Sequence, residues 1–354
     1  MRDRIQSGGL AITDFCNLNC IHCYAGDPQN PQNMPYDRIV FFVDEFVKLQ
    51  AREIVLTGGE PLLHPDIIAV LEFVGRYYPS VPVIITTNGT QFRKEIVDLF
   101  EKYKNLVVQF SLDGSKPSTH ESQHDKGTFV HVINAIHSLD NVPKNRKIIR
   151  MTISKLNYKE AVEVARIAEH HNCGVNYSYV CRAGRAVDNW DLLEMSLAQM
   201  IVVNEELRRY AVLHPGEEIL PPKSIQSCPF EDPDYVFGLN IDPRGNVNVC
   251  TCLGAEYIAG NAYEQSLSSI INSPIIEALT RKIILRKTEL RNTTCTDCRA
   301  LQRCQQGCIG RAARNGDEMG VDDQCDYRRA LQFKNLFLFA EKQLKADGRL
   351  ISGV

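Results

Sequence analysis

From residue 9 to about residue 180 the chain alternates apolar, β-rich runs with stretches of helical periodicity, and this alternation constrains the fold most. The six strand-like runs are Leu10–Thr13, Glu53–Leu56, Val83–Thr87, Leu106–Leu112, Ile148–Ile153 and Val175–Val180. Between them, apolar residues recur at intervals of three and four, as at Ile39, Phe42 and Phe46. Strands that alternate with helices form a parallel sheet with right-handed crossovers. Six such units are two short of a closed eight-fold barrel, so we expect an α/β fold built on an open, partial (β/α)6 TIM-like barrel. Ligands of such sheets bind at the carboxyl ends of the strands.

The pattern changes after residue 190, where the alternation ends. One helix is expected over Ser196–Val212, and Pro221-Pro222 then breaks the chain at a domain boundary. Further on, the runs Val236–Ile241 and Val247–Cys250 flank Asp242-Pro243-Arg244-Gly245, whose residue types favour a turn. Two strands around such a turn predict a β-hairpin.

The last part of the chain is rich in cysteine. A helix from Ser266 to about Leu285 is expected before a cysteine-dense loop at 295–308, and a terminal helix from Tyr327 to about Lys345 after it. The sequence therefore predicts a small cysteine-rich α+β domain behind the barrel. The expected division is a barrel at 1–190, a linking helix at 191–220 and the cysteine-rich domain at 221–354.

Charge and hydropathy exclude several classes of partner. The 354 residues carry a net charge of −3, which gives no electrostatic reason to expect nucleic acid or an anionic membrane. No apolar run approaches the ~20 residues that a membrane span needs, and no signal-peptide core follows the first residues, so we expect a cytoplasmic protein. Disulfides are rare in that reducing compartment. The thirteen cysteines are therefore interpreted first as metal ligands or redox groups.

Three of the cysteines lie in one short loop directly after the first strand. Cys16, Cys20 and Cys23 form a Cys-x3-Cys-x2-Cys pattern. Three thiolates can hold three irons of a [4Fe–4S] cluster and leave the fourth iron open to a substrate. The alternative is a zinc site, but zinc normally needs a fourth protein ligand, and only His22 lies nearby.

This loop and the residues that follow the next strands resemble those of the radical S-adenosylmethionine (SAM) superfamily. His22 occupies the family's aromatic position before the third cysteine, and Tyr24 follows that cysteine. The second strand ends in Thr57-Gly58-Gly59-Glu60-Pro61, similar to the family's Gly-Gly-Glu-Pro motif for the amino group of SAM. The third and fourth strands end in Thr86-Thr87-Asn88-Gly89 and Ser111-Leu112-Asp113-Gly114, where the family contacts the ribose and carboxylate. The resemblance implies SAM contacts from His22, Tyr24, Gly58, Gly59, Glu60, Pro61, Thr87, Asn88, Ser111, Asp113 and, more weakly, Asn157.

The carboxyl-terminal cysteines resemble the SPASM domain, an appendage of radical SAM enzymes that holds auxiliary iron–sulfur clusters. By this resemblance, an outer cluster is held by Cys295, Cys298, Cys304 and Cys325. An inner cluster is held by Cys228, Cys250 and Cys308, with Cys252 as the preferred fourth ligand. An open iron that binds substrate is the rival for that fourth position. A single zinc site on the cysteines of 295–308 is the alternative that spacing does not exclude.

The resemblance implies a radical SAM oxidoreductase with SAM and three [4Fe–4S] clusters, one binding SAM and two auxiliary. SPASM enzymes mostly modify ribosomally made peptides by crosslinking, epimerisation or oxidation of a side chain, and this is the expected function. The alternative is an oxidoreductase or decarboxylase acting on a small molecule such as a sugar or tetrapyrrole. Thr251 stands where relatives that mature sulfatases place an Asp base, which argues against that activity.

The expected partners follow from this chemistry. They are a peptide or small-molecule substrate and a one-electron donor such as flavodoxin or ferredoxin. The barrel begins almost at Met1, so we also expect a separate peptide-recognition protein, or recognition by the SPASM surface.

Several conspicuous residues receive no catalytic role from the sequence. They are expected to serve structural or solvated roles. They are Asp14, His120, His124, His131, His137, Cys173, Cys181, Arg182, Arg185 and Trp190. For Cys181, Arg182, Arg185 and Trp190, at the end of the sixth strand, a place in the substrate pocket is the alternative.

Overall fold

The fold is taken from a computed structural model that describes residues 2–26, 28–217, 219–220, 235–250, 253, 257–288, 293–298, 301–304, 306–330 and 342–345. The strands described form one ten-stranded sheet in the order β10-β9-β8-β1-β2-β3-β4-β5-β6-β7. Its central strands are β1 (Arg4–Thr13), β2 (Glu53–Gly58), β3 (Val83–Thr87), β4 (Leu106–Ser111), β5 (Lys147–Ile153) and β6 (Gly174–Tyr179). Each pairs in parallel with the next, and β7 (Ile219–Leu220) adds to β6 in the same sense. The predicted α/β partial barrel is confirmed, since β10 and β7 are edges that do not pair with each other.

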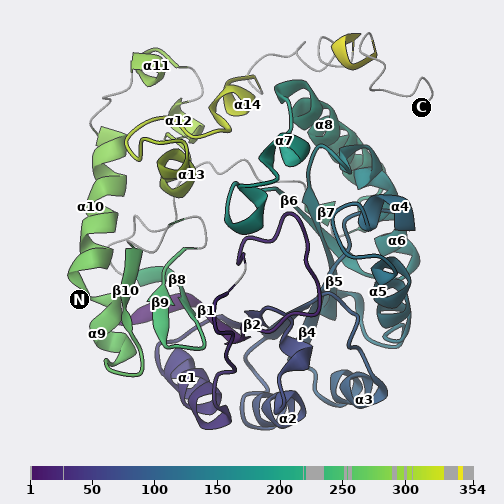
Figure 1. The fold of residues 1–354 in the computed structure, drawn as a ribbon, viewed down its shortest axis with the longest axis vertical. Helices are drawn as coiled ribbons and strands as arrows, with labels where there is room; N and C mark the ends of the chain where they lie inside the picture. Colours follow the sequence, from purple (N-terminus) through teal and green to yellow (C-terminus); the bar gives the residue numbers. More distant parts are fainter. Residues whose placement is uncertain are drawn as a thin grey trace.

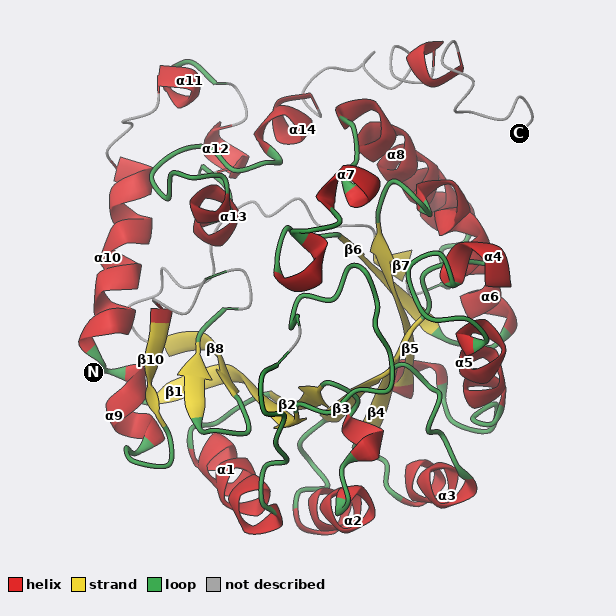
Figure 2. Ribbon diagram, viewed as in Figure 1, coloured by secondary structure: helices red, strands yellow, loops and turns green. Residues whose placement is uncertain are grey.

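Helices cover the outer side of the curved sheet, as Figure 2 shows. They are α1 (Tyr36–Lys48), α2 (Ile67–Tyr77), α3 (Lys94–Lys102), α5 (Thr128–His137) and α6 (Ala161–His170). The apolar stripe of α1, with Ile39, Phe42 and Phe46, is wholly buried against the strands. Alternate strand residues such as Val108 and Phe110 are buried on this side. Their neighbours face the inside of the barrel and remain partly exposed, which leaves the interior open to ligands.

Strand β1 begins at Arg4, six residues before the predicted start, so the expected Leu10–Thr13 strand was too short. The first half of the strand could not be predicted from hydropathy, because Gly8 and Gly9 interrupt it and glycine carries no apolar signal. In the structure a Cβ at Gly8 would lie 2.4 Å from the ring of Phe46. The strand needs a glycine there for α1 to pack closely.

The predicted hairpin is confirmed, and it joins the barrel sheet. Strand β8 (Tyr235–Ile241) pairs in parallel with β1, and β9 (Asn246–Asn248) and β10 (Ile258–Asn261) follow in antiparallel order. Strand β9 ends at Asn248, two residues earlier than predicted. The helix predicted over Ser196–Val212 is α8 (Leu197–Leu213), begun by a capping box between Ser196 and Gln199.

The single helix predicted from Ser266 to about Leu285 is wrong. The structure has two helices, α9 (Leu267–Ile271) and α10 (Pro274–Thr288). Pro274 separates them because it has no N–H to continue the hydrogen bonding of α9 and disfavours a helical residue before it. At the first position of α10 the same proline is well tolerated.

The remaining elements are short. They are α4 (Pro117–His120), α7 (Trp190–Leu193), α11 (Thr293–Thr296), α12 (Leu301–Cys304), α13 (Ile309–Arg314), α14 (Cys325–Ala330), η1 (Pro61–Leu63), η2 (Lys144–Arg146), η3 (Tyr158–Glu160) and η4 (Gly184–Ala186). The predicted terminal helix starts as α14, and residues 331–341 lie outside the described part. Within the described ranges, every helix is too short or too polar to traverse a bilayer.

Candidate functional site

The candidate site lies where the parallel strands end. Figure 1 shows the long loop between β1 and α1 in the centre of the ring of strands and helices. This loop carries Cys16, Cys20 and Cys23, none of which forms a disulfide. Burial raises the pKa of the Cys20 thiol well above its usual range, and the neighbouring Cys23 and Cys16 add to this effect. Three thiolates at this position therefore require a positive charge among them, which the irons of a cluster supply. The loop fits an iron–sulfur cluster on this ground.

A turn from the far side of the barrel holds the cysteine loop in place. Arg185 of η4 donates from its backbone N–H to the carbonyl of Cys23 at 2.9 Å and from Nη1 to the carbonyl of Cys20 at 3.1 Å. Gly184 lies so close to the loop that a Cβ would meet the Cys23 carbonyl oxygen at 2.3 Å, and its φ is +55°. Arg185 was expected in a structural role or in the substrate pocket, and the structure shows that it holds the cysteine loop in place.

Asp113 is buried and organises a group of histidines beside the cysteines. Its Oδ2 accepts from His124 Nε2 at 2.7 Å and lies 3.1 Å from His22 Nε2, and its Oδ1 accepts from the Thr152 backbone at 2.6 Å. Burial alone would raise the pKa of Asp113, but His22 and His124 outweigh it and hold that pKa well below its usual range. The other ring nitrogen of His124 lies 3.0 Å from Cys20 Sγ. Asp113 and His22 were predicted as SAM contacts. The structure places both in this network, and their contact with SAM stays a prediction.

His120 and His124 were passed over in the sequence and belong to the same group. His120 Nδ1 accepts from the Asp113 backbone N–H at 3.1 Å, and its ring stacks on His124 with centroids 4.2 Å apart. Burial and the nearby His124 lower the pKa of His120 to about 3, which keeps the ring a neutral acceptor. The signal in the sequence was the spacing of four between two histidines shortly after β4, which ends two residues before Asp113.

Glu60 is a wholly buried carboxylate that accepts hydrogen bonds from several donors. Its Oε1 accepts from the Leu62 backbone at 3.0 Å and from Thr87 Oγ1 at 2.8 Å, and its Oε2 accepts from the Asn88 backbone at 2.8 Å. Burial raises the pKa of Glu60 to about 7 despite these hydrogen bonds. Among the described residues no Lys or Arg pairs with it. A buried carboxylate that has hydrogen-bond donors but no paired cation among the described residues fits a ligand with an amino group.

The two glycines before Glu60 bring its strand against the cysteine loop. Gly58 has a φ of +141°, and a Cβ there would lie 2.1 Å from the Thr13 carbonyl oxygen. A Cβ at Gly59 would lie 2.2 Å from the carbonyl oxygen of Phe15, next to Cys16. Only glycine allows the end of β2 to approach the start of the loop this closely.

The other predicted SAM contacts lie at the same strand ends. Pro61 starts η1, Ser111 ends β4 on its inner side, and Tyr24 lies near Thr57 and Arg150. Asn157 forms hydrogen bonds within the protein, since its Nδ2 donates to the carbonyls of Asp113 and Thr152, both at 2.9 Å. The structure thus brings these positions together, and their contact with SAM stays a prediction.

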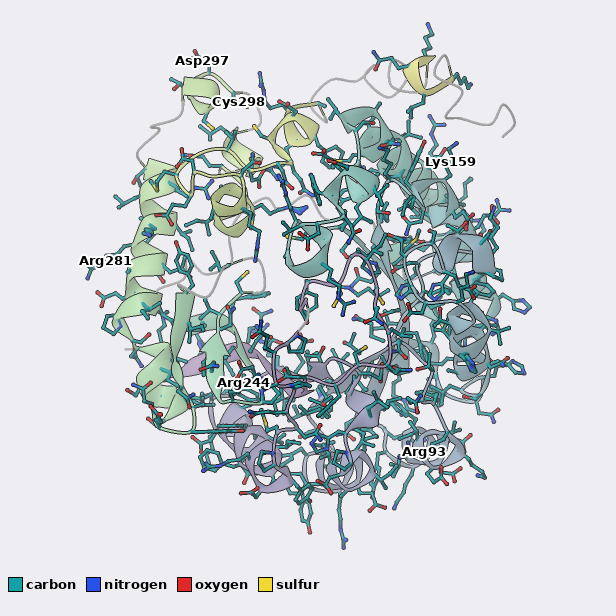
Figure 3. The ribbon with its side chains drawn as sticks, in the orientation of Figure 1. Arg93, Lys159, Arg244, Arg281, Asp297 and Cys298 are labelled. Atoms are coloured by element: carbon teal, nitrogen blue, oxygen red, sulfur yellow. The ribbon has the colours of Figure 1, made fainter. Side chains whose placement is uncertain are left out.

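A turn of the hairpin reaches across to the cysteine loop. Figure 3 shows Arg244 at the turn between β8 and β9. Its Nη1 donates to Asp14 Oδ2 at 2.7 Å, and its Nη2 donates to the Asn30 carbonyl at 2.7 Å. Asp14, expected as a turn residue, also accepts from the Gln32 backbone at 3.2 Å. The cysteine-rich half is therefore tied to the loop that carries Cys16.

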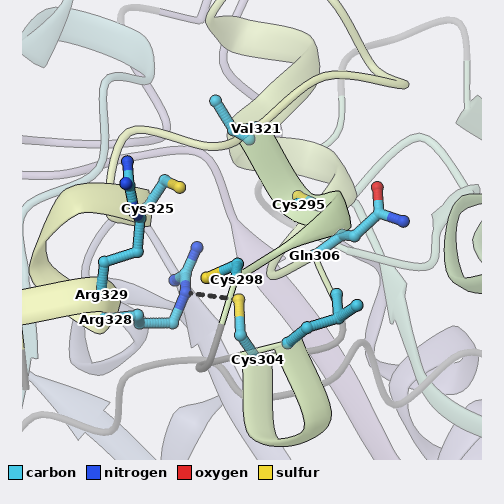
Figure 4. Close-up of a pocket in the computed structure, with 9 residues that line it drawn as sticks. Cys295, Cys298, Cys304, Gln306, Val321, Cys325, Arg328 and Arg329 are labelled. Atoms are coloured by element: carbon cyan, nitrogen blue, oxygen red, sulfur yellow. Dashed lines mark hydrogen bonds between the residues drawn. The ribbon is translucent and has the colours of Figure 1, made fainter. Parts of the chain in front are cut away.

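Four carboxyl-terminal cysteines line one pocket, shown in Figure 4. They are Cys295, Cys298, Cys304 and Cys325. Burial raises the pKa of Cys325 to about 11, and it also raises the pKa of Cys295. Arg328 Nε donates to Cys304 Sγ at 3.0 Å. Its Nη1 is buried without a hydrogen-bond partner among the described residues, a donor that the sulfides of a cluster would satisfy. The pocket fits an iron–sulfur cluster.

The predicted inner set is only partly described. Cys308 is buried and donates its backbone N–H to Asp322 Oδ2 at 2.8 Å, and Cys250 follows the end of β9. Cys228 and Cys252 lie outside the described residues, as does Thr251. Strand β9 ends at Asn248 and, among the described residues, does not continue through Val249 and Cys250, whereas the choice of Cys252 assumed that it does. Of the remaining cysteines, Cys173 is buried in the core and Cys181 lines a second pocket with Arg182 and Trp190.

Asp113→Asn should destabilise the cysteine loop. If the NH2 group of the amide faces His22 and His124, it meets ring nitrogens that now donate, and an imidazole is left unpaired. If it faces Thr152, the hydrogen bond from the Thr152 backbone is lost. We expect a loss of about 3 kcal/mol in stability, as when one partner of a buried charged pair is removed. Thermal melting and the iron content after anaerobic reconstitution measure this effect.

A second His–Asp–His group supplies the control. Asp140 contacts His137 at 2.7 Å and His171 at 3.7 Å but is half exposed. Asp140→Asn should therefore change stability by less than about 0.5 kcal/mol. Equal melting temperatures for the two variants would contradict the organising role of Asp113.

Comparison with known proteins agrees with this geometry. The family model described as "Radical SAM superfamily" matches residues 10–168, and that of an "Iron-sulfur cluster-binding domain", SPASM, matches residues 235–299. The chain is 23% identical over 330 residues to the mycofactocin maturase MftC of Mycobacterium ulcerans (strain Agy99), covering 89% of this chain and 86% of that protein. It is 26% identical over 282 residues to the subtilosin biosynthesis protein AlbA of Bacillus subtilis (strain 168), covering 76% and 60%.

Solved structures share the fold. The SAM-bound crystal structure of Streptococcus suis SuiB superposes with a TM-score of 0.74 at 16% identity, over 91% of this chain and 77% of that one. The match extends over the barrel and beyond it. With the cysteine loop, the buried Glu60 and the second cysteine pocket in place, the chain belongs to the radical SAM superfamily and carries a SPASM domain after its barrel.

Proposed function

We propose that this protein cleaves SAM reductively and uses the resulting deoxyadenosyl radical to modify a side chain of a ribosomally made peptide. The modification is a crosslink, an epimerisation or the oxidation of one residue. The observation that carries the proposal is the placement of Glu60, which is buried and pairs with no Lys or Arg of the described residues, beside a loop of three thiols at the carboxyl edge of the barrel. One feature suits the amino group of SAM and the other suits an iron–sulfur cluster.

The roles follow from position. Cys16, Cys20 and Cys23 would hold the SAM-binding [4Fe–4S] cluster, which with SAM supplies the one-electron cleavage of a carbon–sulfur bond. Glu60 would accept from the amino group of SAM, and Thr87 and the Asn88 backbone hold its carboxylate in place. Gly58 and Gly59 let the backbone of β2 approach the same ligand.

The cysteine-rich half would hold two auxiliary [4Fe–4S] clusters, which makes three in all. The pocket of Cys295, Cys298, Cys304 and Cys325 supports the outer one. Cys228, Cys250, Cys308 and Cys252 are proposed for the inner one. An external one-electron donor such as flavodoxin or ferredoxin would reduce the enzyme, which acts as an oxidoreductase on its substrate.

The names of the relatives support a peptide as substrate. They include a mycofactocin maturase, the subtilosin biosynthesis protein AlbA and the sporulation killing factor maturation protein SkfB. SuiB has also been crystallised bound to its precursor peptide SuiA, with a TM-score of 0.74 to this chain. A separate recognition protein would deliver the peptide, or the SPASM surface would bind it.

Metal analysis followed by product analysis tests the proposal. Protein purified anaerobically should contain iron and sulfide, and with SAM and dithionite it should release deoxyadenosine. Short peptides encoded beside its gene should then lose two hydrogens, or take up deuterium from heavy water if they are epimerised, as mass spectrometry would show. Zinc without sulfide would contradict the enzyme assignment. Turnover of a sugar or tetrapyrrole in place of every peptide would favour the small-molecule alternative.

A further inference from the structure

Arg328 is a buried cation in contact with one of the outer cysteines. Its side chain is only 4% exposed, and its Nε donates to Cys304 Sγ at 3.0 Å. Figure 4 shows the guanidinium directed at that sulfur, with Cys298 beside it. A guanidinium is always charged, so this is a charge-assisted hydrogen bond whose direction is fixed.

The other side of Arg328 pairs with a carboxylate that reaches the predicted inner ligands. Arg328 Nη2 forms an ion pair with Asp322 Oδ1, and Asp322 is wholly buried. The second oxygen, Oδ2, accepts from the backbone N–H of Cys308 at 2.8 Å. One ion pair therefore links the sulfur of Cys304 to the backbone of Cys308.

The turn between these two cysteines is shaped around the ion pair. Gly307 has a φ of +71°, and a Cβ there would lie 2.3 Å from Arg328 Nη2 and 2.4 Å from Asp322 Oδ2. The backbone thus approaches both charges without an intervening side chain. Such a close contact keeps the guanidinium in one orientation toward Cys304.

Charge and hydrogen bonds at the sulfurs are among the factors that set the reduction potential of an iron–sulfur cluster. Reduction adds one negative charge to the cluster, which a nearby cation and a donor to a ligand sulfur stabilise. On the basis of the proposed function, we propose that Arg328 is a positioning residue that raises the reduction potential of the outer auxiliary cluster. Asp322 holds it in place and couples it to Cys308.

A raised reduction potential of the outer cluster would assist the oxidation of a peptide. Removing two hydrogens from a side chain removes two protons and two electrons. One hydrogen atom goes to the deoxyadenosyl radical, the second proton goes to solvent, and the second electron needs an acceptor. A raised potential makes the outer cluster a better final acceptor within the protein, from which an external carrier takes the electron.

Arg328→Gln in the holoenzyme tests the inference. We expect the one-electron potential of the outer cluster, followed by EPR during a redox titration, to fall by about 60 mV, a tenfold change in the equilibrium constant. Arg329→Gln is the matched control, because Arg329 lines the same pocket, is half exposed and lies 3.6 Å from Asp326. It removes the same charge without a hydrogen bond to sulfur, so its shift should be much smaller.

A second variant protects the test against misfolding. Arg328→Gln alone leaves Asp322 buried without its cation, which is destabilising. Arg328→Gln combined with Asp322→Asn removes both charges and the hydrogen bond to Cys304. The potential should still fall, by less than in the single variant because the Asp322 charge is also gone, with iron content unchanged. If Arg328→Gln or the double variant, with normal iron and sulfide, has the wild-type potential or shifts no more than Arg329→Gln, the inference is overturned and the proposed function stands. Zinc at these cysteines in the wild type would overturn the auxiliary cluster itself.

Discussion

Replacing Cys16, Cys20 and Cys23 together with Ala should abolish the reductive cleavage of SAM while the auxiliary clusters remain. The three thiols lie in one loop at the centre of the barrel, whereas the outer cysteines line a separate pocket. Deoxyadenosine, measured after anaerobic incubation with SAM and dithionite, should fall to the level of the enzyme-free reaction. The iron content should fall by one cluster and not to zero.

The matched control is Cys173→Ala, since Cys173 is also a described cysteine but is buried in the hydrophobic core just before β6, where its Sγ lies 3.5 Å from the His171 carbonyl oxygen. This variant should retain its iron and its deoxyadenosine formation. Deoxyadenosine formed by the triple variant at the wild-type rate would show that the initiating cluster lies elsewhere in the chain.

The barrel could be predicted because its signals are local. Strands β2 to β6 are rich in apolar and β-branched or aromatic residues, and helices such as α1, α2 and α6 repeat their apolar residues at three and four. Strand β1 was predicted too short, since Gly8 and Gly9 are required by packing against Phe46 and leave no trace in a hydropathy pattern. The break at Pro274 could have been predicted, because proline at that position ends one helix and begins another.

The candidate site was predicted only in part, because some of its features are local motifs and others are contacts between distant residues. The spacing of the cysteines and the Gly58-Gly59-Glu60 segment are motifs within a few residues, so the sequence displays them. The contacts that arrange them join distant positions: Arg185 braces Cys20 and Cys23, and His124 contacts Cys20 across about a hundred residues. Only the fold brings such residues together, which is why both were passed over.

The role of Arg328 could not be predicted from the sequence for the same reason. Beside Arg329 in the sequence it looks like half of a charged pair on a helix surface, yet one side chain is 4% exposed and the other 49%. Helical rotation alone separates two neighbours by about 100°. Which of them faces the cysteines depends on the packing of α14, and that is a property of the whole domain.

Glu60→Gln should weaken the binding of SAM about a hundredfold. All three partners of the Glu60 carboxylate donate hydrogen bonds, so it is arranged to accept at both oxygens. An amide offers one oxygen and one NH2 group, and the NH2 group would meet a donor on whichever side it lies. Breaking a buried, charge-assisted contact costs about 3 kcal/mol, and every 1.4 kcal/mol is tenfold in affinity. Equilibrium binding to the anaerobically reconstituted protein measures the change, with the exposed Glu101→Gln as control.

The dependence on pH separates this role from a structural one. Burial raises the pKa of Glu60 to about 7 in the SAM-free protein, so the carboxyl carries a proton below that pH and a charge above it. An amino group binds the charged form. The affinity of the wild type for SAM should therefore be constant above about pH 7 and fall as the pH drops below it, by up to tenfold per unit. Glu60→Gln has no proton to lose there, so its weaker affinity should lack this step. If both proteins show the same pH dependence, another group titrates at the site and Glu60 does not receive the amino group of SAM.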